Sequence, residues 1–159
     1  MVKHNTGPTY NEQLQAIVTK FIESGQKLPV TTHAIAAFAV REGLWKPQPF
    51  TIIDQCAEHL ARAMREEYIK DEQGRTVRAK HVARVVRDGI QTALWDDIRT
   101  APREHMAIAF QQRRQQIVGD CRQLKTDVDS YNENKSPRPP IQMVFDFTED
   151  LRELEAMVA

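Results

Sequence analysis

Residues 51–80 read TIIDQCAEHLARAMREEYIKDEQGRTVRAK, and this stretch decides the fold that we expect. In its first part, apolar residues recur at helical spacing, and Thr51 is placed to cap the helix that they form. Residues 71–74 have turn chemistry, with Gly74 available for a positive φ. Residues 75–80 then alternate between small or apolar and basic side chains, as in a half-buried strand. The stretch therefore predicts a helix and then a short β-hairpin whose second strand is basic.

Two further helices are predicted upstream of this stretch. Thr9 and Glu12 have the spacing of a capping box, and the apolar residues behind them fall on one helical face, so a helix is expected over about residues 10–24. A second helix is expected to start near Thr31 or Thr32, either of which can cap it.

Three helices followed by a basic hairpin is the element order of a winged helix-turn-helix, and residues 9–82 resemble that family. The expected fold class is mainly α with a small β-hairpin. The resemblance implies that the helix beginning at Thr51 lies in the major groove of DNA and that the hairpin around Gly74 contacts the backbone. The DNA-binding residues that it implies are Gln55, Glu58, His59, Arg62, Arg65, Arg75, Arg78, Lys80 and Arg84. Since winged-helix domains also dock on proteins, a protein-interaction scaffold without nucleic-acid binding is the alternative.

The distribution of charge agrees with a nucleic-acid ligand. The 22 basic and 22 acidic residues balance, which counts against a protein coated in nucleic acid by charge alone. Residues 75–87, however, hold five basic residues and His81 with no acid, whereas residues 141–159 are mainly acidic. We therefore also hypothesise that the acidic segment masks the basic hairpin in the absence of DNA.

A long helix is predicted over residues 101–133, after a connector at 83–100. Within the connector, Leu94, Trp95 and Ile98 suggest one or two helical turns, and Thr100 is placed to cap the long helix. A narrow seam repeats along that helix in alternating steps of four and three, as in a coiled coil. The residues of the seam, which we expect to form a homodimer, are Phe110, Arg114, Ile117, Cys121, Leu124, Val128 and Tyr131. The pattern leaves open whether the two helices run parallel or antiparallel.

Two features of the second half have alternative interpretations. Arg114 either specifies the register of the seam or extends outward while the helix packs on its own domain, and the second account is favoured. The glutamine- and arginine-rich run at 111–116 could extend a DNA-binding surface, but we again favour packing on the same domain. Beyond a proline-rich linker at 134–140, residues 141–159 predict a strand and an acidic helix that Thr148 caps.

The sequence gives little support for an enzyme. There is no phosphate-cradling glycine loop and no nucleophile elbow, so no cofactor is expected. Cys56 and His59 lie three residues apart on one helix, but no second pair has ligand spacing, so no metal is expected. Cys56 and Cys121 are interpreted as reduced core residues. Without an apolar leader or a membrane-spanning run, we expect a cytoplasmic protein.

Overall fold

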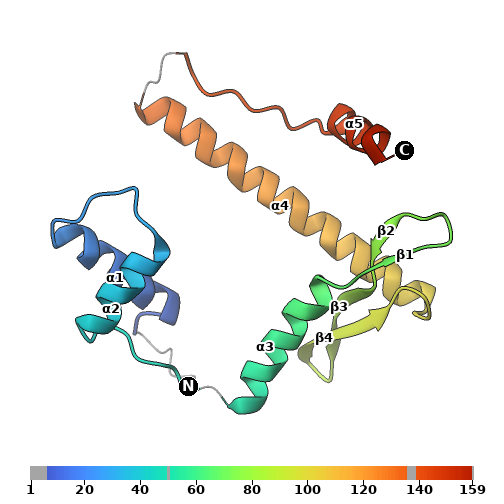
Figure 1. The fold of residues 1–159 in the computed structure, drawn as a ribbon, viewed down its shortest axis with the longest axis horizontal. Helices are drawn as coiled ribbons and strands as arrows, with labels where there is room; N and C mark the ends of the chain where they lie inside the picture. The colour runs from blue at the N-terminus through green and yellow to red at the C-terminus, as the bar shows by residue number, and fades with distance from the viewer. Residues whose placement is uncertain (1–6, 50, 136–138, 159) are drawn as a thin grey trace. The chain divides into compact units, whose positions relative to one another are not determined.

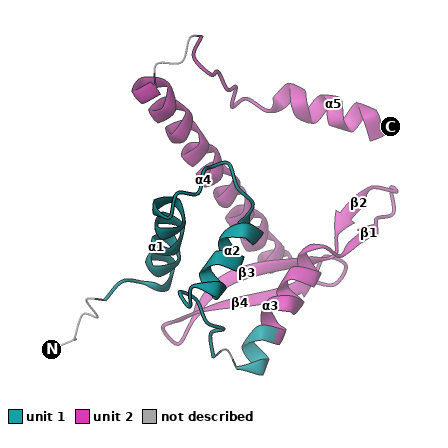
Figure 2. Cartoon of the chain, turned by 60° about the vertical axis from the view of Figure 1, so that its left-hand side comes forward, with its two compact units in different colours: residues 1–55 teal, residues 56–159 magenta. Residues whose placement is uncertain are grey.

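In a computed structural model, which describes residues 7–49, 51–135 and 139–158, the chain is mainly helical, with two small antiparallel sheets and one long helix towards its C-terminal end (Figure 1). The chain divides into two compact units, residues 1–55 and residues 56–159 (Figure 2). None of the described helices is both long and apolar enough to cross a membrane.

The first unit contains the helices α1 (Tyr10–Glu23) and α2 (Thr32–Arg41). The predicted capping box is confirmed, because Thr9 Oγ1 accepts from the amide of Glu12 at 3.2 Å and the Glu12 carboxylate accepts from the amide of Thr9 at 2.6 Å. Of the two threonines proposed to cap the second helix, Thr31 does so.

Aromatic side chains hold this helical pair together. The rings of Phe21 and Phe38 meet edge to face with their centroids 5.4 Å apart, and Phe21 is buried. The indole N–H of Trp45 donates to the hydroxyl of Tyr10 at 2.9 Å, which fastens the chain after α2 to the start of α1.

Helix α3 (Ile52–Arg65) crosses the boundary between the units, and Thr51 begins it as predicted by accepting from the amide of Asp54 at 3.1 Å. The interpretation of Cys56 as a core residue is wrong in this structure, because Cys56 is exposed, none of the residues of α3 is buried, and Leu60 on its apolar face is 57% exposed. The reason is that, within residues 56–159, the strands after α3 pack on the long helix and leave this face uncovered.

The hairpin predicted after α3 is confirmed. Strands β1 (Tyr68–Lys70) and β2 (Thr76–Arg78) pair antiparallel, and Gly74 has a φ of 79° in the turn between them. A second hairpin follows directly, made of β3 (Lys80–Arg87) and β4 (Ile90–Asp97).

The second hairpin corrects the interpretation of residues 83–100 as a connector with helical turns, because Leu94 and Trp95 lie in β4 and Ile98 follows it. The turn between β3 and β4 consists of two residues, Asp88 with a φ of 49° and Gly89 with a φ of 75°. Two positive φ angles in a two-residue loop are what a type I′ turn requires, and such a turn matches the twist of the paired strands.

The two hairpins are joined at Ala79, which is completely buried. Its amide donates to the carbonyl of Glu67, two residues after α3, and its carbonyl accepts from the amide of Ile98 after β4, both at 2.9 Å. Because this residue ties three segments together without room for a larger side chain, its position fixes β2 and β3 relative to the ends of α3 and β4.

The long helix α4 (Arg103–Lys135) begins at Arg103, so Thr100 does not cap it; the carbonyl of Pro102 instead accepts from the amide of Met106 at 3.2 Å. The first part of α4 packs on β3, where Ala83 of the strand and Ala109 of the helix are both buried. Alanine at both positions allows the helix and the strand to approach closely.

Helix α5 (Thr148–Val158) agrees with the predicted acidic helix, but Thr148 is its first residue and its hydroxyl donates to Asp146 at 2.7 Å instead of capping the helix. The strand predicted before it is absent, since residues 141–147 have no regular secondary structure. The side-chain amide of Asn132 on α4 replaces a strand partner for Ile141. It donates to the carbonyl of Ile141 at 2.8 Å and accepts from its amide at 3.0 Å. Of the predicted linker, residues 134–135 continue α4, and residues 136–138 lie outside the described residues.

Candidate nucleic-acid interface

A pocket of about 460 Å³ lies within residues 56–159, where the end of α3, strands β2 to β4 and the first half of α4 meet. Basic side chains from each of α3, β2, β3 and α4 line it: Arg65, Arg78, Lys80, Arg84 and Arg113. Asp120 is the one acidic residue in that lining. Local concentrations of one sign of charge in a concave site raise the local concentration of oppositely charged ligands, so this pocket is the candidate site.

The four arginines of the pocket keep their positive charge available. None of them forms an ion pair with a carboxylate in the part of the chain that the structure describes. Two of them lie over aromatic rings instead: the guanidinium carbon of Arg65 lies 5.4 Å from the ring centroid of Trp95, and that of Arg78 lies 6.0 Å from the ring centroid of Tyr68. These contacts orient the guanidinium groups without neutralising them.

Lys80 has a different role from the one that the sequence suggested. Its ammonium group lies 2.7 Å from a carboxylate oxygen of Asp97 and 3.4 Å from one of Glu67, and its side chain is only 27% exposed. The hydrogen bond to Asp97 raises the pKa of Lys80. Since two carboxylates already compensate this charge, Lys80 is part of an internal network rather than a free phosphate contact.

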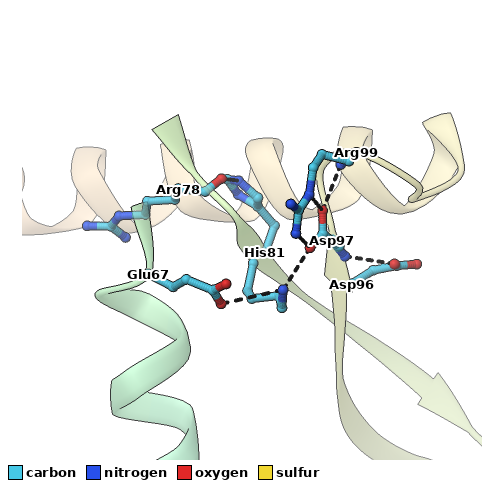
Figure 3. A network of polar contacts seen from close by, with 7 residues as sticks. Glu67, Arg78, His81, Asp96, Asp97 and Arg99 are labelled. Atoms are coloured by element: carbon cyan, nitrogen blue, oxygen red, sulfur yellow. Dashed lines mark hydrogen bonds and ion pairs between the residues drawn. The ribbon is translucent and has the colours of Figure 1, made fainter. Parts of the chain in front are cut away.

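That network is centred on Asp97 at the end of β4 (Figure 3). The carboxylate of Asp97 accepts from Nε and from a terminal nitrogen of Arg99 at 2.8 and 2.7 Å, from the amide of Arg99 at 2.9 Å, and from Lys80. The hydrogen bonds from Arg99 and Lys80 hold the pKa of Asp97 far below its usual range. The network therefore ties the end of β4 to the start of β3 and, through Glu67, to the short segment between α3 and β1.

Arg75 also has an internal partner. Its Nε lies 2.7 Å from a carboxylate oxygen of Asp71, and its amide donates to the same side chain at 2.8 Å, so it closes the turn between β1 and β2. Burial would raise the pKa of Asp71, but the hydrogen bonds from Arg75 outweigh it and lower that pKa. Arg75 does not line the pocket.

Of the nine predicted DNA-binding residues, the structure brings together Arg65, Arg78, Lys80 and Arg84. Four residues on α3 are exposed on that helix and do not line the pocket: Gln55, Glu58, His59 and Arg62. The face of α3 that was expected to read base edges is therefore separate from the pocket, to which α3 contributes its last residue.

Sequence reasoning missed the part of the pocket that α4 and β4 provide. Six residues of α4 line it and share one helical face at three- and four-residue spacing: Ala109, Gln112, Arg113, Gln116, Asp120 and Ile117, the last of which also belongs to the predicted seam. This spacing was a usable signal, and it passes through the run at 111–116. As favoured from the sequence, that run packs on its own domain, but it also provides the wall of the site.

Gln112 holds α4 against the open edge of β3. Its side-chain amide accepts from the amide of Arg84 at 2.8 Å and donates to the carbonyl of Arg84 at 2.7 Å, as a neighbouring strand would. Nearby, the ring of His81 meets that of Phe110 edge to face at 5.2 Å, and His81 is buried. The position of Arg84 therefore depends on α4.

Replacing Gln112 by alanine removes both hydrogen bonds to the backbone of Arg84. We expect a decrease of about 1–3 kcal/mol in the free energy of unfolding, because each hydrogen bond contributes about 0.5–1.5 kcal/mol. Urea unfolding followed by circular dichroism measures it. Gln115→Ala, on the same helix outside the pocket lining, is the control; equal decreases for the two variants would contradict the role assigned to Gln112.

The residues of the predicted seam divide into two groups. Phe110 contacts His81 of the same chain but is still 48% exposed, and Val128 lines a second pocket, of about 350 Å³, with residues 141–145. Large apolar members remain well exposed on this chain: Ile117, Leu124 and Tyr131. Arg114 is exposed, and Cys121 is partly exposed. The exposed members of the seam remain accessible on this chain, and their pairing with a second chain stays a prediction.

Neither a metal site among the described residues nor a similar known protein indicates what this chain does. Among residues 7–49, 51–135 and 139–158, there is no group of three or more His, Cys, Asp or Glu side chains that could hold a metal ion. Cys56 and His59 are both exposed on α3. In comparisons with known proteins, no family model, no curated protein and no solved structure matches the chain.

Proposed function

We propose that this protein binds DNA through the basic pocket, and that it does so as a homodimer paired along α4. The observation that carries the proposal is the convergence of Arg65, Arg78, Arg84 and Arg113 from four different elements on one concave site, with no carboxylate ion pair among the described residues. Phosphate is the ligand that planar guanidinium groups recognise best, because they present paired donors.

The internal pairing of other basic residues supports the proposal. Where a basic side chain stabilises the hairpins, as Lys80 and Arg75 do, a carboxylate lies within 4.0 Å of it. The four arginines lack such a partner among the described residues, although assembling like charges around one site is unfavourable. A polyanion would offset that repulsion, and DNA adds the entropy of released counterions.

The winged helix-turn-helix stays a prediction for residues 9–82, and the hypothesis that the acidic segment masks the basic hairpin likewise stays a prediction. The dimer part of the proposal is supported by α4, whose 33 residues carry exposed apolar side chains well beyond the part that packs on β3. A two-fold pair of such helices would present two basic pockets, one from each chain, to one duplex or to two.

Replacing Arg84 and Arg113 together by alanine tests the DNA part. We expect affinity for a random duplex at about 50 mM salt to fall by about 10- to 100-fold. The slope of log K against log salt should become shallower by about 2, because two phosphates are no longer neutralised by an arginine. Fluorescence anisotropy with a labelled duplex at several salt concentrations measures both quantities.

Arg122→Ala is the matched control, since Arg122 lies on the same helix but does not line the pocket. It should leave the affinity and the slope close to those of the wild type. Duplex binding that is equally weakened by both changes would count against the pocket. A protein that binds no nucleic acid while remaining a dimer would favour the protein-interaction scaffold instead.

A further inference from the structure

The basic pocket has the dimensions of a small-ligand site rather than of a duplex. Its volume of about 460 Å³ lies in the range of roughly 300–1,000 Å³ found for small-molecule pockets. The major groove of a duplex is already about 12 Å wide, so double-stranded DNA can pass across such a pocket but cannot enter it. The phosphates of a duplex can reach the edge of the pocket, but a base can enter it only from a part of a strand that is not paired.

The lining of the pocket is mixed in a way that fits one nucleotide. The guanidinium groups provide donors for a phosphate, and Val82, Trp95, Ala109 and Ile117 provide apolar surface. Trp95 is partly exposed on β4, and Arg65 lies over its ring. Aromatic rings and arginine planes are the groups on which unpaired bases stack, whatever their sequence.

Asp120 completes the set of groups. A carboxylate in the pocket opposes a phosphate in its immediate vicinity, but it accepts hydrogen bonds from the exocyclic amine of a base, as carboxylates do from cytosine N4. Gln112 is held by the backbone of Arg84, whereas Gln116 has no side-chain hydrogen bond among the described residues. Gln116 therefore has both a donor and an acceptor for the same base edge.

We infer that the pocket takes one unpaired nucleotide of a DNA strand, with its phosphate on the guanidinium groups of Arg84 and Arg113 and its base against Trp95. The inference rests on the proposed function, because the pocket is part of the surface proposed to bind DNA. It adds that the protein prefers DNA with an exposed strand end, gap or flipped base over an intact duplex.

The full-length protein is titrated with three labelled probes: a blunt duplex, the same duplex with a short cytosine overhang, and the same duplex with an abasic overhang. We expect the cytosine overhang to bind about tenfold more tightly than the blunt duplex, since stacking one base on an aromatic ring raises the affinity by roughly that factor. The abasic overhang, which keeps the extra phosphates, should bind only slightly more tightly than the blunt duplex. A thymine overhang, which lacks the amine, should fall between these two.

Tryptophan fluorescence provides a readout that leaves the pocket intact. The chain has two tryptophans, so Trp45→Phe makes Trp95 the sole reporter. We expect the cytosine overhang to quench this fluorescence and the blunt and abasic probes to leave it unchanged. In binding titrations, Trp95→Leu should remove the preference for the overhang, and Trp45→Leu should keep it.

The outcomes separate the inference from the proposed function. Equal affinities for all probes, with no quenching of Trp95, would overturn the inference while leaving duplex binding in place. Tight binding of the overhang alone, with blunt duplex unbound, would support the inference and overturn duplex binding. An abasic overhang that binds as tightly as the cytosine overhang would show that phosphate alone is recognised, and this also overturns the inference.

Discussion

Replacing Asp97 by alanine should destabilise residues 56–159 more than replacing the carboxylate of any other ion pair among the described residues. The carboxylate receives four hydrogen bonds, from Lys80 and from three N–H groups of Arg99, and it joins the end of β4 to the start of β3. Removing it leaves the half-buried ammonium of Lys80 with Glu67, at 3.4 Å, as its sole carboxylate partner among the described residues. A half-buried charge that loses its closer partner costs more free energy of unfolding than an exposed pair contributes.

Urea unfolding at neutral pH measures this effect as a lower midpoint. Asp129→Ala is the control, because Asp129 makes a single pair with Lys125 at 2.6 Å on the exposed surface of α4. Such a pair contributes about 0.5 kcal/mol or less. We expect the shift for Asp97→Ala to be several times larger, and similar shifts for the two variants would show that the network adds nothing to stability.

The same carboxylate predicts how stability depends on pH. The pKa of Asp97 is lower in the folded chain than in the unfolded chain, where aspartate has a pKa of about 3.9. Its contribution is therefore complete above about pH 4 and is lost as the pH falls below that value towards the folded pKa. Between neutral pH and about pH 3, the urea midpoint of the wild type should fall more steeply than that of Asp97→Asn. Parallel curves would contradict this assignment.

The local elements were predictable where a short motif determines them. The capping box of Thr9 and Glu12, the cap at Thr31 and the turn at Gly74 all lie where the sequence placed them, since each depends on residues within four positions of one another. The second hairpin was missed although its signal is equally local. Asp88 and Gly89, flanked by apolar alternation, form the strongest two-residue turn that a sequence offers.

The site was less predictable because its residues meet through tertiary packing. The absence of acids between Arg75 and Arg87 suggested a uniformly cationic strand, yet Asp97 lies beside Lys80 because β4 returns antiparallel to β3. Similarly, Arg113 lies beside Arg84 in the pocket because the side chain of Gln112 forms hydrogen bonds that hold α4 against β3. Sequence spacing within a helix indicates which residues share a face, but not which strand that face will meet.

Replacing Leu124 by glutamate should convert the proposed dimer into a monomer. Leu124 is 47% exposed on α4, on the same stripe as Ile117 and Tyr131, and the described residues of its own chain leave that stripe largely uncovered. Two leucines, one from each chain, would be removed per dimer. Because each is already about half buried in its own chain, covering the rest contributes about half of the roughly 1.5–3 kcal/mol of a fully buried leucine, and each glutamate also brings a charge into the interface. We therefore expect the dissociation constant of the dimer to rise at least about tenfold, which sedimentation equilibrium measures.

Thr126→Glu is the matched control, because it adds the same charge on nearly the opposite side of α4, where it faces Arg122 one turn earlier. It should leave the dimer intact. The helical signal in circular dichroism should be retained in both variants, so that dissociation of the dimer is distinguished from unfolding of the helix. Duplex affinity should fall with Leu124→Glu alone, since two pockets on one dimer bind with avidity that separate monomers lack. A wild-type chain that sediments as a monomer at every concentration would contradict the pairing of α4, and the arginine pocket would then bind DNA one chain at a time.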